Sequence, residues 1–304
     1  MQVVHGSETL EQRPKPVITI GNFDGVHVGH RALIERTRAM AERMSVPSGA
    51  LTFHPTPQEV LRPDSAAPRI QSLAQRIEML AATGLDYLVV EPFSLDVAAL
   101  TAEDFAHRIL KARLGVRGLA LGYDFRFGRG RAGAVDTLKA CLDVPIEHQA
   151  AVELDGRPVS SSRVRQAVRV GDVALAGRCL GRPHAVRGAV VAGEQRGRKL
   201  GFPTANLREI EGLAPARGVY ATWAWAEGVR HRAVANLGVR PTVDGVDAVD
   251  VVLEVHLLDF AGDLYGASVM VEFVELLRGE TAFPDLDALR AQISRDTEAA
   301  RGWL

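Results

Sequence analysis

The first half of the chain alternates short β-branched runs with longer amphipathic stretches. Four runs have the length and composition of buried strands, at 17–20, 49–53, 87–90 and 119–122. Three stretches have the length of amphipathic helices, at 31–44, 71–82 and 101–114. Strands that alternate with helices at this spacing predict a parallel sheet covered on both faces. In such a sheet, ligands bind at the carboxyl ends of the strands.

The second half has a different pattern, because short strand-like runs follow one another with Gly, Pro or Asp between them. These runs cover 185–191, 220–226, 232–237, 250–257 and 268–276, and one long helix is predicted at 285–304. This order is typical of a small antiparallel β-barrel with a C-terminal helix. We place the boundary near residue 182, which gives domains at 1–182 and 183–304. The first dozen residues are expected to be loosely held.

Composition and charge exclude several classes of protein. A hydrophobic fraction of 47% and a charged fraction of 24% over 304 residues are typical of a folded globular chain. The net charge of -1 argues against a general nucleic-acid binder. The two cysteines, Cys141 and Cys179, lie far apart and are expected to be reduced core residues. We find no signal peptide and no apolar run of about 18 residues, so we expect a cytoplasmic protein without a membrane segment.

The stretch GNFDGVHVGH follows the first predicted strand and precedes the first predicted helix. Its glycines permit a tight turn against a ligand. His27 and His30 would lie at the helix start, where imidazole N–H groups and the helix dipole both favour phosphate. A metal site is the weaker alternative, because no third His, Cys or carboxylate lies beside them at a familiar metal spacing. A tight turn with no ligand is the remaining alternative.

Four segments of the first half together resemble one enzyme family. GNFDGVHVGH is similar to the His-x-Gly-His loop of the nucleotidyltransferase superfamily, and its ten-residue form resembles the prokaryotic bifunctional riboflavin kinases/FAD synthetases. The other three segments, in the family's order, are LTFHPTPQEV, LGYDFRFGRGRAG and VSSSRVR. Each lies where a parallel sheet presents its ligand loops. The resemblance implies that 1–182 is a Rossmann-like nucleotidyltransferase domain, an FMN adenylyltransferase.

The resemblance also implies which residues of this half take part in adenylyl transfer. The FMN phosphate would attack the α-phosphorus of ATP, and His27, His30 and Arg165, with Mg2+, would stabilise the developing charge. Further residues implied to bind nucleotide or flavin are Gly21, Asn22, Phe23, Asp24, Gly29, Asp124, Ser161, Ser162 and Arg163. One position departs from the family, since a histidine usually lies between the prolines of FHPTP, where this chain has Thr56. The departure predicts weaker phosphate binding at this site.

A glycine-rich basic segment opens the second half. GAVVAGEQRGRKLGFPTANL lacks the Gly-Lys-Ser/Thr ending of a Walker A loop, and its residues alone fit either a phosphate-binding loop or a solvated hairpin tip. Its last part resembles the Gly-x-Pro-Thr-Ala-Asn signature of riboflavin kinases. By that resemblance, Thr204 and Asn206 would hold Mg2+ beside the ATP phosphates through hard neutral oxygens. The loop residues implied to bind ATP are Gly193, Arg198, Lys199, Gly201 and Pro203.

The segment LEVHLLDF resembles the part of the kinase family that carries the catalytic glutamate. Strand alternation places Glu254 opposite an apolar face formed by 251, 253, 255 and 257. That position fits a base facing a substrate hydroxyl, and it also fits a solvated carboxylate. The resemblance assigns Glu254 as the general base that deprotonates the riboflavin 5'-hydroxyl for attack on the γ-phosphorus of ATP. It also places Arg278, Glu280 and Phe283 at the flavin pocket.

The resulting expectation is a bifunctional enzyme of flavin cofactor synthesis. It would phosphorylate riboflavin to FMN in the second half and adenylylate FMN to FAD in the first, with ATP as co-substrate and Mg2+ as the metal. Its partners would be these small molecules, with no nucleic acid and no membrane. Two alternatives stay open: a riboflavin kinase without adenylyl transfer, motivated by Thr56, and a non-catalytic flavin-binding protein. The sequence also leaves open whether the chain forms a homo-oligomer.

Overall fold

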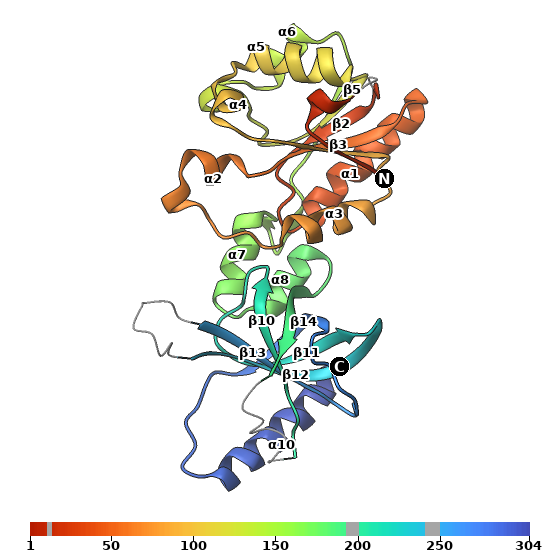
Figure 1. Cartoon of the computed structure of the whole chain (residues 1–304). Helices are drawn as coiled ribbons and strands as arrows, with labels where there is room; N and C mark the ends of the chain where they lie inside the picture. Colours follow the sequence, from red (N-terminus) through yellow and green to blue (C-terminus); the bar gives the residue numbers. More distant parts are fainter. Residues whose placement is uncertain (11–13, 193–200, 241–249) are drawn as a thin grey trace. The chain divides into compact units, whose positions relative to one another are not determined.

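The computed structural model describes residues 1–10, 14–192, 201–240 and 250–304 (Figure 1). The chain divides into two compact units, Met1–Ser160 and Ser161–Leu304, and each is described by itself. The contacts therefore group two short helices, α7 (Ser161–Arg169) and α8 (Val173–Leu180), with the second unit. The predicted functional boundary near residue 182 stays a prediction. Within the described residues, no helix is both long enough and apolar enough to cross a membrane.

The first unit is built on a six-stranded parallel sheet with the strand order β1-β4-β3-β2-β5-β6. The strands are β1 (Gln2–His5), β2 (Val17–Ile20), β3 (Ser48–Phe53), β4 (Tyr87–Glu91), β5 (Gly118–Gly122) and β6 (Ile146–Gln149). The four predicted strands are confirmed to within one residue at each end. Their apolar runs are continuous because both faces of these central strands are covered. The two edge strands, β1 and β6, were not predicted.

The N-terminus differs from the expectation of a loose segment. Gln2–His5 forms β1, which pairs in parallel with β4 in the register of Val3 with Leu88. A short 3-10 helix follows at Ser7–Thr9, and the Ser7 backbone and hydroxyl both donate to the buried carboxylate of Glu91 at the end of β4. The expectation was wrong because a four-residue edge strand is too short to produce a clear alternation.

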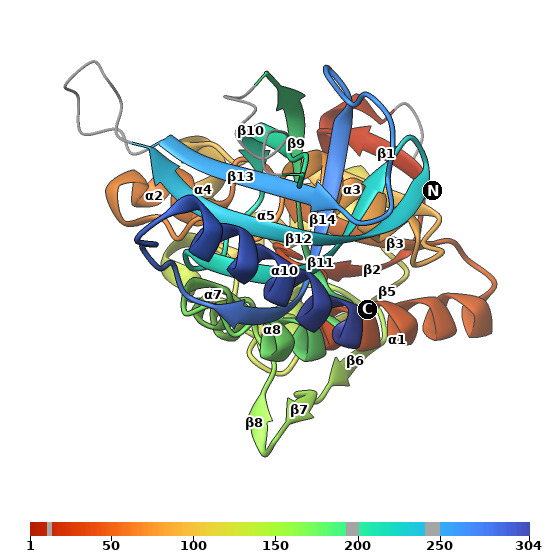
Figure 2. The same cartoon turned by 90° about the horizontal axis from the view of Figure 1, so that it is seen from below.

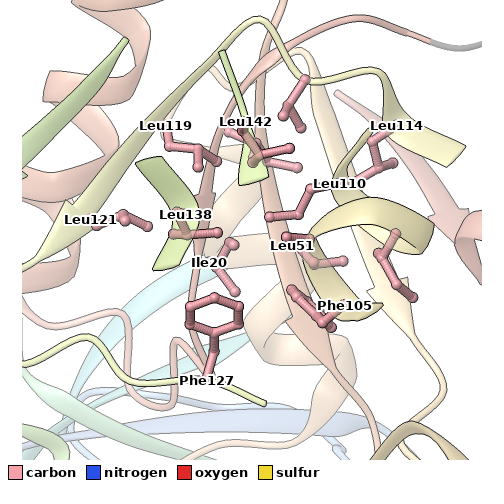
Figure 3. Close-up of a cluster of buried hydrophobic side chains, with 14 of the residues drawn as sticks. Ile20, Leu51, Phe105, Leu110, Leu114, Leu119, Leu121, Phe127, Leu138 and Leu142 are labelled. Carbon is pink, nitrogen blue, oxygen red and sulfur yellow. The ribbon is translucent and has the colours of Figure 1, made fainter. Parts of the chain in front are cut away.

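Helices cover both faces of this sheet, as predicted. They are α1 (Val28–Met44), α2 (Pro57–Leu61), α3 (Leu73–Ala81), α4 (Leu95–Ala99), α5 (Ala102–Phe105), a π-helix at Ala106–Leu114 and α6 (Val135–Cys141). On one face, Phe105, Leu110 and Leu138 pack against Ile20 and Leu51 of the strands (Figure 3). On the other face, buried residues of α1 and α3 pack against β3, β4 and β5. The segment predicted as one helix over 101–114 continues through α5 into the π-helix without a break.

The second unit is a closed antiparallel barrel with the strand order β10-β13-β12-β11-β14-β9. Its strands are β9 (His184–Val191), β10 (Ala205–Glu211), β11 (Gly218–Ala226), β12 (Val229–Arg240), β13 (Asp250–Leu257) and β14 (Ser268–Arg278). The predicted barrel is confirmed, with β10 as an unpredicted strand. A long helix, α10 (Leu286–Trp303), packs on β11, β12 and β14 (Figure 2).

Alternation along the barrel strands decides which side chains face its interior. On β13, Leu253, Val255 and Leu257 are buried in the barrel core, whereas Glu254 and His256 are half-buried between them. Since neighbouring side chains on a strand point to opposite faces, Glu254 lies on the outer face, as the alternation predicted. The outer face is also where Val219 and Val234 meet Ala300 of α10. The barrel thus presents Glu254 outside an apolar core.

Candidate active sites

The loop between β2 and α1 holds an unusual backbone conformation. Gly25 has φ 87, but Phe23 and Val26, which carry side chains, also have positive φ values of 50 and 40. Both side chains are fully buried and pack in the core between the sheet, α1 and α3. Because a β-branched residue in the left-handed region is strained, the surrounding packing must hold the loop in this shape. The glycine-rich stretch is therefore a rigid turn at the carboxyl end of β2.

His27 caps the N-terminus of α1. Its Nδ1 accepts the backbone N–H of His30 over 3.3 Å. An Nδ1 that accepts a hydrogen bond carries no proton, so the N–H of the His27 ring is at Nε2. Position 29 favours glycine, because a Cβ there would lie only 3.2 Å from the His27 ring. The helix α1 thus begins at Val28, three residues before the predicted start at residue 31.

His30 lies directly against His27. The two rings stack with centroids 3.6 Å apart. The Phe23 and His30 rings meet in a T-shaped arrangement, with their centroids 5.2 Å apart. Burial holds the pKa of His30 well below its usual value, and the neighbouring His27 and Arg76 lower this pKa further. His30 is therefore neutral at pH 7. Its Nδ1 is buried and accepts or donates no hydrogen bond within the described part of the chain.

Arg76 of α3 fixes the other side of this loop. Its side chain is buried, and its guanidinium donates to the backbone carbonyl of Asn22 over 2.6 Å and to that of Phe53 over 3.4 Å. Asp24, also buried, accepts the backbone N–H of Ile70 with both carboxylate oxygens at 3.1 Å. Asp24 thus holds the loop to the segment before α3, and Arg76 holds it to α3 itself. Arg76 was not predicted, since one arginine in an amphipathic helix gives no sequence signal.

The FHPTP segment places Thr56 at the start of α2. The Thr56 hydroxyl accepts the backbone N–H of Glu59, and the Glu59 carboxylate accepts from the Thr56 backbone over 2.7 Å, which forms a capping box. Arg69 pairs with the same carboxylate at 2.9 Å. His54, two residues earlier, is half-buried, and burial together with Arg69 and Arg76 lowers its pKa. Thr56 therefore has a structural role, and His54 is the imidazole of this segment.

The remaining predicted residues of the adenylyltransferase half fall into two groups. Gly21 and Asn22 lie in the loop already described, and Asp124 is exposed after the carboxyl end of β5. Ser161, Ser162, Arg163 and Arg165 lie in the first turns of α7, in the second unit. The structure brings Phe23, Asp24, His27, Gly29 and His30 together in the β2–α1 loop and the first turn of α1. The convergence of the α7 residues on that loop stays a prediction.

The kinase residues meet along one row of the barrel. Asn206 of β10 is paired in register with Glu254 of β13, and Glu254 is paired in turn with Asn236 of β12. The row continues from Asn236 to Val219 of β11 and from Val219 to Arg278 of β14. Residues directly opposite one another on neighbouring strands share a face of the sheet. Three residues predicted at widely separated positions, Asn206, Glu254 and Arg278, therefore lie on one outer row.

The segment before β10 is anchored on β13. The His256 ring Nδ1 donates to the carbonyl of Pro203 over 2.8 Å, and the Phe202 ring meets the His256 ring edge-on at 5.6 Å. Gly201 has φ 87, a conformation that favours glycine. Thr204 is half-buried two residues before Asn206, which is buried. The predicted loop residues Gly193, Arg198 and Lys199 lie outside the described residues.

Arg278 at the end of the row is already paired. Its guanidinium donates from Nε over 3.1 Å and from Nη2 over 2.8 Å to the buried carboxylate of Asp296 on α10. The ring of Phe283 lies 5.5 Å from the guanidinium carbon, which is a cation–π contact. Glu280 approaches Gly238, where a Cβ would lie 2.8 Å from its Oε1. The three residues predicted at the flavin pocket are thus gathered at the end of β14.

The oxygen donors at the start of β10 fit Mg2+ rather than a transition metal. Thr204 offers a hydroxyl and Asn206 an amide oxygen, both hard neutral ligands. Among the described residues, no cluster of three or more His, Cys, Asp or Glu side chains could hold a metal ion by itself. A divalent ion here would therefore need oxygens from a bound phosphate as well.

Comparisons with known proteins agree for both halves. The FAD synthetase family model matches residues 9–163 and the riboflavin kinase family model matches residues 180–304. A bifunctional riboflavin kinase/FMN adenylyltransferase from Pseudomonas fluorescens is 42% identical over 305 residues, covering 99% of this chain and 97% of that protein. The protein of the same description from Escherichia coli strain K12 is 41% identical over 307 residues, with the same coverage.

A solved structure supports the fold. The crystal structure described as a macrolide-efflux protein from Streptococcus pneumoniae aligns with a TM-score of 0.91 and 32% identity, covering 99% of both chains. Its efflux description applies to that protein alone. The matches to both family models favour the bifunctional expectation over a kinase that lacks adenylyl transfer. The chain belongs to the family of bifunctional riboflavin kinases/FMN adenylyltransferases.

Proposed function

We propose that the β2–α1 loop carries the adenylyl transfer and that the outer row of the barrel carries the phosphorylation. The chain has both activities, riboflavin kinase and FMN adenylyltransferase. The assignment of each activity to residues is our inference, as is its division between functional domains at 1–182 and 183–304. The observation that carries it is that the His27 and His30 loop lies in the first compact unit, whereas the row of Asn206, Glu254 and Arg278 lies in the second. The cytoplasmic location stays a prediction.

In adenylyl transfer, an FMN phosphate oxygen forms a bond to the α-phosphorus of ATP while the bond to pyrophosphate breaks. No covalent enzyme intermediate is needed, so the site must position two anions and stabilise charge. His27 would donate from Nε2 to a phosphate oxygen, because its Nδ1 is occupied by the helix cap. His30, which is neutral, would donate without adding a charge. Arg163 and Arg165 would supply positive charge from α7.

In phosphorylation, the riboflavin 5'-oxygen forms a bond to the γ-phosphorus of ATP while the bond to ADP breaks. Glu254 would take the hydroxyl proton as this bond forms. Thr204 and Asn206 would hold Mg2+ beside the ATP phosphates, and the ion would supply charge neutralisation there. Arg278 and Phe283 would border the flavin ring, with the guanidinium held in place by Asp296.

Two variants test the division of labour. Glu254→Ala should abolish FMN formation from riboflavin and leave FAD formation from supplied FMN, because the base serves only the kinase. His30→Ala should do the reverse. Product chromatography with riboflavin, ATP and Mg2+, and separately with FMN, ATP and Mg2+, distinguishes the outcomes. An equal loss of both activities in either variant would contradict the two-site assignment.

A further inference from the structure

His256 lies beside the segment that presents the proposed magnesium ligands, and neither predicted site includes it. It follows Glu254 by two residues on β13, so both side chains face outward. β10 pairs with β13 in the register of Ala205 with Val255. Continuing this antiparallel register by one residue puts Thr204 opposite His256. Thr204 and His256 therefore belong to the same outer face as Glu254.

His256 contacts the segment before β10 in two ways. Its Nδ1 donates to the carbonyl of Pro203 over 2.8 Å. Its ring meets the Phe202 ring edge-on, with the two centroids 5.6 Å apart. Proline has no N–H, so its carbonyl is the backbone group through which the chain can be held at this point. His256 thus fixes the chain immediately before Thr204.

We propose that His256 is a positioning residue for riboflavin phosphorylation, which holds Thr204 where its hydroxyl can bind the Mg2+ of ATP together with Asn206. The inference rests on the proposed ligand role of Thr204 and Asn206. Asn206 lies within the paired part of β10, whereas Thr204 precedes it and depends on another anchor. A hydrogen bond to the residue before Thr204 removes conformational freedom in advance, so that less entropy is lost when ATP and Mg2+ bind.

The barrel contains a second histidine that serves as a matched control. His231 of β12 meets the Phe260 ring edge-on, with centroids 5.1 Å apart, much as His256 meets Phe202. Phe260 lies beyond the end of β13 and not in the segment before β10. Substitutions at His231 therefore change a similar aromatic contact on the same barrel without changing the anchor of Thr204.

The first test separates the hydrogen-bond donor from the ring. His256→Phe keeps an aromatic ring and removes the donor, whereas His256→Asn keeps a donor at the place of Nδ1 and removes the ring. In the full chain with Mg2+, His256→Phe should raise the KM for ATP in riboflavin phosphorylation about 3- to 10-fold, as expected for one hydrogen bond. The KM for riboflavin and kcat should change less. His256→Asn should retain most of the affinity for ATP, and His231→Phe should leave all three constants unchanged.

Hydrogen exchange of the full chain without ligands gives a second readout that does not depend on activity. The backbone amides of Thr204 and Ala205 should exchange about 3- to 10-fold faster in His256→Phe than in the unmodified protein, because the segment opens more often. In His231→Phe they should exchange at the unmodified rate. All variants should keep FAD formation from supplied FMN.

Three outcomes would contradict these expectations in different ways. An unchanged KM for ATP or an unchanged exchange rate in His256→Phe would overturn the inference, and so would a His256→Asn variant as impaired as His256→Phe. Thr204→Val tests the underlying assignment, because an unchanged KM for ATP in that variant would refute the ligand role of Thr204. A raised KM in Thr204→Val with an unchanged KM in His256→Phe would refute only the role of His256.

Discussion

His27 combines a structural role and a proposed chemical role in one imidazole. Its Nδ1 caps α1 and its Nε2 faces away from the helix cap. The cap needs only a side-chain acceptor at the N-cap position, which Asn provides as well. The proposed chemistry needs the ring. The two roles can therefore be separated by a choice of substitution.

His27→Asn should keep the stability of the first unit and lose FAD formation. His27→Ala should lose FAD formation as well, and should lower the free energy of unfolding by about 1 kcal/mol, because the cap is removed. Urea unfolding followed by far-UV circular dichroism and a chromatographic FAD assay measure both quantities. If His27→Asn retained FAD formation, the imidazole would be a helix cap and nothing more.

His184 makes the stability of the barrel depend on pH. Its ring Nε2 donates to the Leu213 carbonyl over 2.7 Å at the start of β9. Burial lowers the pKa of His184 to about 4, against the opposing effect of this hydrogen bond. In the unfolded chain the pKa is about 6.5, so below that pH the unfolded state binds a proton that the folded state does not.

The barrel should therefore lose stability as the pH falls from about 6.5 to about 4, by about 3 kcal/mol in total from this one group. The three tryptophans, Trp223, Trp225 and Trp303, all lie in the second unit, so their fluorescence reports its unfolding alone. His184→Gln, which keeps an amide donor, should flatten the pH dependence. An equally steep dependence in that variant would assign it to other groups.

At the scale of elements, two ion pairs of different burial fasten α10 to the barrel among the described residues. Arg278 of β14 pairs with Asp296, whose side chain is 7% exposed. Arg301 near the C-terminal end of α10 pairs with Asp259, whose side chain is 70% exposed. Removing one partner of a buried pair leaves an uncompensated charge, whereas exposed pairs contribute little.

Asp296→Asn should lower the free energy of unfolding of the barrel by about 2–3 kcal/mol, because Arg278 stays behind with a weaker acceptor. Arg301→Ala is the matched control on the same helix and should shift the unfolding midpoint only slightly. Denaturant unfolding followed by tryptophan fluorescence measures both. Equal shifts would mean that burial does not distinguish the two pairs.

The sequence predicted those elements whose pattern is local. The run at Val17–Ile20 was predicted without error because all four residues are β-branched and buried. β10 was missed because the sequence ANLREIE has several polar side chains on both faces. The motif residues were identified from resemblance, but the pairing of Asn236 with Glu254 depends on the barrel register. Register follows from strand pairing, which no local pattern contains.

At the scale of the whole molecule, the two short helices α7 and α8 decide where an independently stable kinase fragment begins. Val173 of α8 is fully buried and belongs to the barrel core. A Cβ on Gly171 would lie 3.2 Å from the hydroxyl of Tyr220, a fully buried residue of β11. The helices therefore pack on the barrel although the family model for the kinase begins only at residue 180.

A fragment of residues 161–304 should be more stable than one of residues 183–304. Loss of the buried Val173 side chain alone costs about 2 kcal/mol, and more core is uncovered with it. Thermal unfolding of the two fragments by tryptophan fluorescence, together with riboflavin phosphorylation by each, measures the difference. Equal unfolding temperatures would show that the barrel is self-sufficient from residue 183.

The closure of the barrel also bears on association between copies of the chain. A closed barrel has no free strand edge, so a second chain cannot extend it by backbone pairing. The parallel sheet has two open edges, β1 and β6, and each is only four residues long. Short edges give an incoming strand few hydrogen bonds. Closure therefore prevents edge-to-edge pairing of the barrel, and the short edges of the parallel sheet disfavour it there.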